Sequence, residues 1–65
     1  MAQPIFERGY AFYITKNYQK ALNDFNKVRE LNPDNGEIYY WIGEVELAKG
    51  NNRNACENFE IAKNN

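Results

Sequence analysis

The side chains that most often carry out catalysis are scarce in this sequence. It contains no histidine and no serine, and its single threonine, Thr15, lies near the end of a predicted helix. Cys56 has neither a histidine nor a second cysteine to activate it, which favours a half-buried helix position over a nucleophile. The sequence therefore predicts a protein that is not an enzyme.

Metal binding would depend on carboxylates, because histidine is missing and only one cysteine is present. Glu37, Glu44 and Glu46 do not have the loop spacing of a site for a hard cation. The glycine-rich patterns that bind phosphate or dinucleotides do not occur. We expect no metal and no cofactor.

The composition is that of a small globular domain. The chain has 65 residues, 43% hydrophobic and 26% charged, and a formal net charge of −1. This charge gives no general attraction to nucleic acid or to an anionic membrane. One cysteine excludes an internal disulfide, and the sequence has no signal-peptide pattern and no apolar run of membrane-spanning length. We expect a cytoplasmic setting and no contact with membranes or nucleic acid.

Four helices are expected to position the remaining side chains, because apolar residues recur at helical spacing and never alternate over a long stretch. The first runs from Pro4 to about residue 15. A second is expected to begin with Asn17 as its cap, and Pro33 stops it. Asp34 resembles the first residue of a capping box for a third helix over residues 37–49, with Gly50 as its stop.

A fourth helix carries Ala55, Cys56, Phe59 and Ala62. Because all the connections are short, neighbouring helices should be antiparallel. The sequence predicts an all-α fold of two antiparallel helix-turn-helix hairpins in a single domain over residues 1–65.

Small residues recur in the two predicted hairpins at a constant offset. Gly9 aligns with Gly43, Asn17 with Asn51, Ala21 with Ala55 and Phe25 with Phe59. In each hairpin the glycine belongs to the first helix and the alanine to the second, with the same spacing between them. Small residues at both sites allow two helices to approach closely, and the phenylalanine fills the space beside the crossing.

With this register the sequence resembles the tetratricopeptide repeat (TPR) family, whose 34-residue pattern is W-x2-L-G-x2-Y, then A-x3-F, then A and P. The first repeat covers residues 2–35, and the second covers residues 36–65 and stops after its second helix. The resemblance assigns repeat packing to matching positions: Gly9, Ala21, Phe25, Val28, Pro33, Gly43, Ala55, Phe59 and Ala62. Arg8 departs where leucine is expected, and Glu46 departs where an aromatic residue is expected.

The resemblance also implies a short right-handed α-solenoid whose first helices line a concave groove. The groove positions in this sequence are Phe6, Tyr10, Tyr13, Glu37, Tyr40, Trp41, Glu44 and Leu47. Such an aromatic and acidic surface suits a peptide or partner protein with apolar anchors and a basic residue. Packing between the hairpins is an equal alternative for Trp41. Phe6, Tyr10 and Trp41 occupy positions where some TPR proteins carry a clamp for chaperone tails, so that clamp is absent.

The second repeat is more polar, with Glu46, Asn52 and Cys56 at positions that hold Phe12, Tyr18 and Leu22 in the first. This difference predicts that the second repeat is a terminal or near-terminal unit.

The leading interpretation is a noncatalytic interaction module, as a fragment or subunit of a larger assembly. The alternative is a minimal or designed repeat unit that chiefly folds or self-associates, with a homo-oligomer formed through an exposed edge at Phe59, Ile61 and Ala62. RNA recognition by a helical repeat is a third interpretation, which the acidic groove and the near-neutral charge disfavour.

Overall fold

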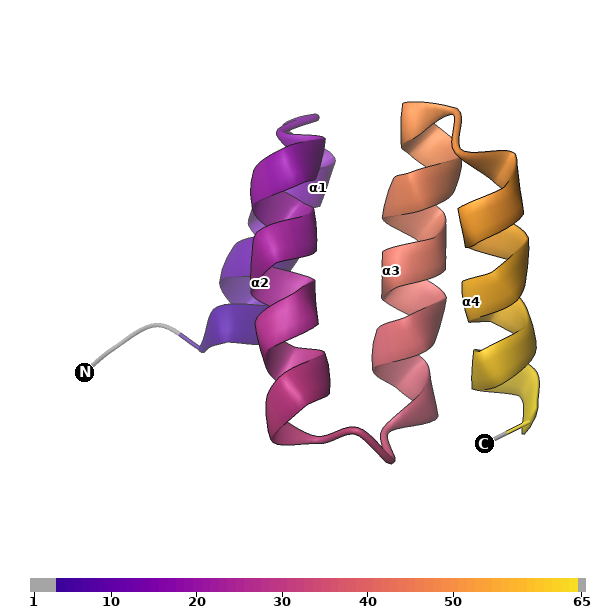
Figure 1. Ribbon diagram of the computed structural model, residues 1–65. Coiled ribbons are helices and arrows are strands. Elements are labelled where there is room, and N and C mark those ends of the chain that lie inside the picture. The colour runs from indigo at the N-terminus through magenta and orange to yellow at the C-terminus, as the bar shows by residue number, and fades with distance from the viewer. Residues whose placement is uncertain (1–3, 65) are drawn as a thin grey trace.

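The computed structural model describes residues 4–64 and consists of four α-helices (Figure 1): α1 (Ile5–Ile14), α2 (Tyr18–Leu31), α3 (Gly36–Lys49) and α4 (Asn52–Asn64). We call α1 and α2 hairpin 1, and α3 and α4 hairpin 2. The predicted all-α class and the two hairpins are confirmed. The ends of the two predicted repeats, at residues 2, 3 and 65, lie outside the described residues.

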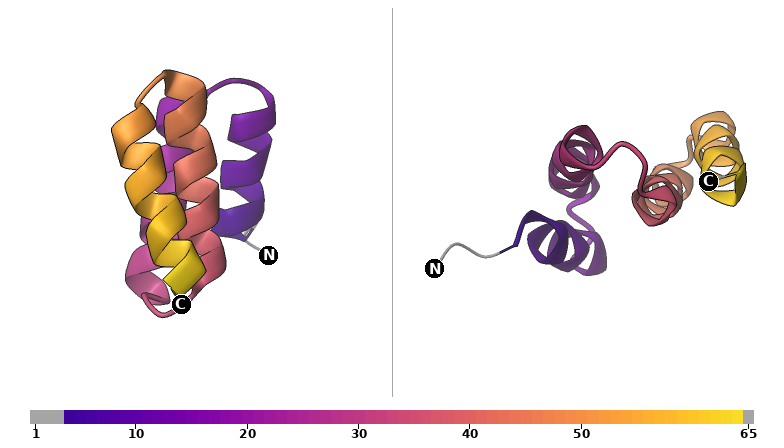
Figure 2. Two further views of the ribbon diagram at one scale, coloured as in Figure 1. Left: turned by 90° about the vertical axis from the view of Figure 1, so that its right-hand side faces the viewer. Right: turned by 90° about the horizontal axis from the view of Figure 1, so that it is seen from below.

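The helices follow one another in space as they do in sequence, because α1 packs on α2, α2 on α3 and α3 on α4. Seen along the helix axes, they alternate in a zigzag (Figure 2). The Cα atoms extend over 34 × 25 × 13 Å, so the molecule is a thin slab with little interior. In such a slab only the middle helices are covered on two sides.

The first helix of each hairpin ends in the same way. Gly50 has a left-handed backbone with φ 92°, and the Asn51 N–H donates to the Glu46 carbonyl at 2.9 Å. Lys16, the corresponding residue of hairpin 1, has φ 66°, and the Asn17 N–H donates to the Phe12 carbonyl at 2.8 Å. Both ends have the backbone geometry that favours glycine. The stop at Gly50 is confirmed, whereas the left-handed Lys16 was not predicted.

Asn17 occupies the N-cap position of α2 as predicted, but it does not cap the helix through its side chain. The Asn17 side chain makes no capping hydrogen bond, and its amide instead donates to the Thr15 hydroxyl at 2.9 Å. That bond turns the Asn17 side chain towards the end of α1, which leaves the start of α2 without a side-chain cap.

The predicted cap of α3 is wrong. The capping residue is Asn35, whose side-chain oxygen accepts from the Glu37 N–H at 3.0 Å. The helix begins at Gly36, so Asp34 lies one residue too early to act as its cap.

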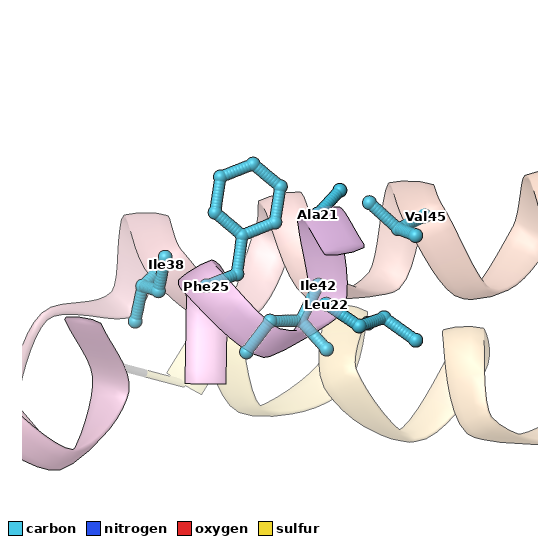
Figure 3. Packing of buried hydrophobic residues seen from close by; sticks show 6 residues of the cluster. All are labelled: Ala21, Leu22, Phe25, Ile38, Ile42 and Val45. Atoms are coloured by element: carbon cyan, nitrogen blue, oxygen red, sulfur yellow. The ribbon is translucent and has the colours of Figure 1, made fainter. Parts of the chain in front are cut away.

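The hydrophobic core lies between α2 and α3, and therefore between the two hairpins (Figure 3). Its buried residues are Ala21, Leu22, Phe25, Ile38, Ile42 and Val45. Phe25, Ile38 and Val45 are completely buried. Burying side chains of this size stabilises a protein by about 1.5–3 kcal/mol each, so hairpin 1 depends on hairpin 2 for most of its core.

Candidate interaction surface

The two helices of each hairpin pack closely where a glycine of the first helix meets a phenylalanine of the second. A Cβ atom on Gly9 would lie 2.9 Å from the Phe25 ring, and one on Gly43 would lie 2.7 Å from the Phe59 ring. Neither position has room for a side chain as packed. Ala21 and Ala55, on the second helix of each hairpin, are also buried.

The remaining residues with a predicted packing role differ in burial. Val28 is half-buried and packs against the core, and Ala62 is half-buried on α4. Pro33 is exposed in the turn between the hairpins, where its carbonyl accepts from the Tyr39 hydroxyl at 3.3 Å. Phe25 is fully buried, whereas Phe59 is only half-buried, because α3 covers α2 but no helix of the described chain covers α4 on its outer side.

Trp41 is the centre of an aromatic cluster at the junction of the hairpins. Its ring centroid lies 6.1 Å from Phe6, 5.4 Å from Tyr10, 6.2 Å from Tyr13 and 6.4 Å from Phe25 on hairpin 1. On its own helix, Tyr40 lies 5.5 Å away. Several of these pairs meet edge to face, a favoured geometry for aromatic rings. Trp41 is half-buried, and this placement favours packing between the hairpins as its main role.

The outer part of this cluster remains open to solvent. Tyr10 is 42% exposed, Tyr40 is 44% exposed and Leu47 is 49% exposed. Since Tyr10 and Tyr40 both contact Trp41, α1 and α3 present them on one continuous surface. We call the eight predicted groove residues (Phe6, Tyr10, Tyr13, Glu37, Tyr40, Trp41, Glu44 and Leu47) the aromatic face.

Acidic groups lie among these rings. Glu37 is exposed at the start of α3, and Glu44 is half-buried two turns further along. Burial raises the pKa of Tyr13, and the negative charge and hydrogen bonding of Glu44 raise it further. The phenol of Tyr13 is therefore kept neutral and able to donate a hydrogen bond beside a carboxylate.

An ion pair that sequence reasoning missed connects α1 to α2. The Arg8 guanidinium donates from Nε at 2.9 Å and from one terminal nitrogen at 2.7 Å to the two oxygens of the buried Asp24 carboxylate. The hydrogen bonds and charge of Asp24 raise the pKa of Arg8. An arginine at a leucine position, with an acid on the facing helix, was the signal available. Ile42 and Asn58 occupy the corresponding positions of hairpin 2.

A second unpredicted feature is a hollow of about 760 Å³ on hairpin 2. It is lined by Gly36, Glu37, Tyr40, Glu44, Phe59, Ala62 and Lys63. Glu37, Tyr40 and Glu44 also belong to the aromatic face, so the two surfaces overlap along α3. We call this feature the α3–α4 hollow.

The expected half-burial of Cys56 is wrong, since the thiol is exposed. The corresponding Leu22 is buried because α3 packs over it, whereas the outer side of α4 has no such neighbour among residues 4–64. Asn52 is likewise exposed, and Glu46 accepts hydrogen bonds from Asn51 and Asn54. Within the same residues, no cluster of three potential metal ligands occurs. None of the helices in this range combines the length and apolar character needed to cross a membrane.

Two comparisons with known proteins bear on this surface. The family model described as "TPR repeat" matches residues 9–50, which run from Gly9 in α1 through α2 and α3 to Gly50 and do not include α4. The chain is also similar to the DnaJ homolog subfamily C member 3 homolog of Dictyostelium discoideum, with 38% identity over 48 residues. The match covers 74% of this chain and 10% of that protein, so the chain spans about a tenth of its relative's length.

Proposed function

Since the chain belongs to the TPR repeat family, we propose that it is a noncatalytic module that binds a peptide or a partner protein on its aromatic face. The observation that carries this proposal is the pair Tyr10 and Tyr40. Each contacts Trp41, at 5.4 and 5.5 Å, while more than two fifths of its side chain stays exposed. Rings held by packing on one side and free on the other are suitable anchors, because little conformational entropy is lost on binding.

The proposal includes two tandem TPR units, residues 2–35 and 36–65, within one domain. The recurrence of structural details at corresponding positions supports it. Gly9 and Gly43 each approach a phenylalanine ring, and Lys16 and Gly50 each adopt a left-handed backbone. Two repeats are fewer than the three that such arrays usually need for stability, which favours a role within a larger assembly. We propose a cytoplasmic setting, in keeping with a single, exposed thiol.

The chemistry of the face indicates the class of ligand. Tyr10, Tyr40 and Leu47 offer apolar contact area, and Glu37 and Glu44 provide negative charge beside it. Opposite charges steer and orient a ligand, whereas apolar anchors supply most of the affinity. We therefore infer a short peptide segment with aromatic or aliphatic anchors and at least one lysine or arginine.

Selection from a displayed peptide library on the full chain tests this proposal. We expect enriched peptides to combine apolar and basic residues. Tyr10→Ala and Tyr40→Ala should each weaken the best peptide by about tenfold or more, while unfolding midpoints change little. Leu31→Ala is the matched control, because Leu31 is also exposed, at 61%, but lies at the end of α2. Selection of acidic peptides, or loss of binding in Leu31→Ala alone, would contradict the proposal.

Self-association is the second candidate function. The observation that favours it is the outer edge of α4, where Ile61 is 42% exposed beside the half-buried Phe59 and Ala62. Exposed apolar groups of this kind can be covered by a second copy of the chain. Sedimentation equilibrium decides between the candidates, since a monomer at millimolar concentration contradicts self-association and a dimer lost in Ile61→Asp supports it.

A further inference from the structure

The two hairpins carry corresponding hollows, and only one of them is filled. In hairpin 1, Phe6, Tyr10 and Phe25 surround the Trp41 ring, which α3 supplies. The corresponding residues of hairpin 2 are Tyr40, Glu44 and Phe59, and all three line the α3–α4 hollow. Tyr40 and Phe59 lie 5.7 Å apart, much as Phe6 and Phe25 lie 5.5 Å apart. The described chain therefore contains both a filled site for tryptophan and an open copy of it.

We propose that the α3–α4 hollow receives an amphipathic helix of a partner protein, anchored by a tryptophan and flanked by basic residues. This inference rests on the proposed function, because it specifies the partner of a surface that overlaps the aromatic face. The hollow has a volume of about 760 Å³, large enough for an indole ring together with neighbouring aliphatic side chains.

The structure itself shows how such a helix is recognised. α3 covers hairpin 1 with Ile38, Trp41, Ile42 and Val45, which follow the spacing i, i+3, i+4 and i+7. This is the spacing of an amphipathic helix that lies in a groove. A partner helix with the pattern apolar-x-x-Trp-apolar-x-x-apolar would present the same face to hairpin 2.

Charge distinguishes the open hollow from the filled one. Glu44 lines the hollow where hairpin 1 has the neutral Tyr10, and Glu37 adds a second carboxylate on α3. Lys63 and its counterpart Arg29 carry the same charge, so they make no difference between the hairpins. A helix that suits the α3–α4 hollow should therefore carry lysine or arginine where α3 carries glutamate.

A second copy of this chain, stacked head to tail, does not meet these requirements. Its α1 would present Glu7 in place of Trp41, and Pro4, Arg8 and Ala11 in place of the three aliphatic residues. It would thus bring a carboxylate towards Glu37 and Glu44 and leave the aromatic hollow without a ring. The chemistry of the hollow therefore disfavours a second copy of α1 as the source of the helix.

The test uses a fluorescent peptide with the sequence of residues 35–50 and the changes Glu37→Lys and Glu44→Lys. Fluorescence anisotropy with the full chain measures its affinity. We expect saturable binding, weakened about 30-fold or more by Trp41→Ala in the peptide, which is the loss typical of a central anchor. The peptide with the original glutamates should bind several-fold more weakly at low salt.

Chain variants locate the binding site. Ala62→Phe puts a ring into the hollow and should weaken peptide binding about tenfold or more, whereas Glu57→Phe adds the same ring at an exposed position of α4 outside the hollow and should leave it unchanged. Unfolding midpoints show whether each variant remains folded, and Ala62→Ile serves if Ala62→Phe does not fold. Absence of binding, or binding that Ala62→Phe leaves unchanged and Tyr10→Ala abolishes, overturns this inference. The second result would still support the proposed function on the aromatic face.

Discussion

Hairpin 1 and hairpin 2 share the same local structural features but differ in which helix packs over them. Each has a glycine beneath a phenylalanine ring, an alanine at the helix crossing and a left-handed residue at the end of its first helix. Phe25 is completely buried because α3 packs against α2, whereas Phe59 on α4 is only half-buried. The same residue type in the same local setting is thus core in one hairpin and part of an open surface in the other.

The first helices of the two hairpins differ in burial in the same way. Core positions of α3, Ile38, Ile42 and Val45, correspond to Pro4, Arg8 and Ala11 at the start of the chain, all of which are exposed. Arg8 is used instead to pair with Asp24 within hairpin 1. The stability of the molecule is therefore concentrated where α2 meets α3, and its outer helices contribute less.

The largest effect expected from this comparison is that of truncating the two phenylalanines. Phe25→Ala should cost about 3–5 kcal/mol, which approaches the whole stability of a chain of this size, because a buried ring leaves a cavity. Phe59→Ala should cost about 1 kcal/mol, since part of that ring already contacts water. Urea unfolding followed by circular dichroism measures both. Equal losses would show that the two hairpins are equally covered.

Substituting alanine for Gly9 or Gly43 should give a smaller difference in stability between the two hairpins. Gly9→Ala should destabilise the protein by about 1–2 kcal/mol, because Phe25 and the Asp24 Cβ lie within 3.1 Å of the new methyl group and the buried ring has no space to move. Gly43→Ala should cost less than about 1 kcal/mol. The Phe59 ring borders the hollow and has open space beside it, so the gain of about 1 kcal/mol in helix propensity, which alanine brings at both glycines, offsets more of the steric cost here.

Urea midpoints of the two single variants and of the double variant measure these costs. The Ala55 carbonyl, 3.2 Å from the added methyl group, is the contact that could raise the cost at Gly43. If Gly43→Ala is less stable than Gly9→Ala, the Phe59 ring does not have the open space that we expect beside it.

Substitutions at the two left-handed residues, Gly50 and Lys16, should have smaller effects on stability, and these effects should be opposite in sign. Gly50→Ala should destabilise by about 1 kcal/mol through backbone strain alone, because φ is 92° and no atom lies within 4 Å of the added Cβ. Lys16→Gly should stabilise by about 0.5 kcal/mol, since it relieves the same strain at φ 66°. Thermal unfolding detects both, at about 4–8 °C per kcal/mol for a domain of this size. Lys16→Ala, which keeps the strain, is the control for loss of the charge.

The smallest effect is a dependence on alkaline pH. The pKa of Tyr13 is raised above its ordinary value of 10.0 by burial and then by Glu44. The folded state therefore prefers the neutral phenol. The contribution of Tyr13 to the free energy of unfolding is fully present below the unfolded pKa and is lost as the pH rises through the higher folded pKa. Urea midpoints between about pH 8 and 11 should fall less steeply in Tyr13→Phe than in the parent chain. Identical slopes would contradict this environment for Tyr13.

Much of the fold follows from residues whose effect is local or repeated. Helix periodicity, the break at Pro33 and the stop at Gly50 predicted the four helices, and the short connections between them predicted the hairpins. Caps were harder, because Asp34 and Asn35 are both good capping residues and only the exact first residue of α3 selects between them. Asn17 lies at the predicted N-cap position, but its side chain bonds to Thr15 instead.

The site was predictable in its residue types but not in its burial. The exposure of Cys56 and the half-burial of Trp41 depend on which helix faces which, and periodicity within one helix does not contain that information. Arg8 and Asp24 lie on different helices and need the hairpin geometry to bring them together. The α3–α4 hollow likewise depends on the absence of a covering helix over α4 in the described chain, together with the ring positions of Tyr40 and Phe59.

Amide hydrogen exchange, resolved by residue in the free chain, tests most directly whether hairpin 1 is closed by hairpin 2 while hairpin 2 stays open. We expect the slowest exchange in the parts of α2 and α3 that form the core, from Ala21 to Val28 and from Ile38 to Val45. Amides around Phe59 in α4 should exchange about tenfold faster or more, because α4 opens without breaking that core. Equal protection of α4 and α2 would contradict this expectation.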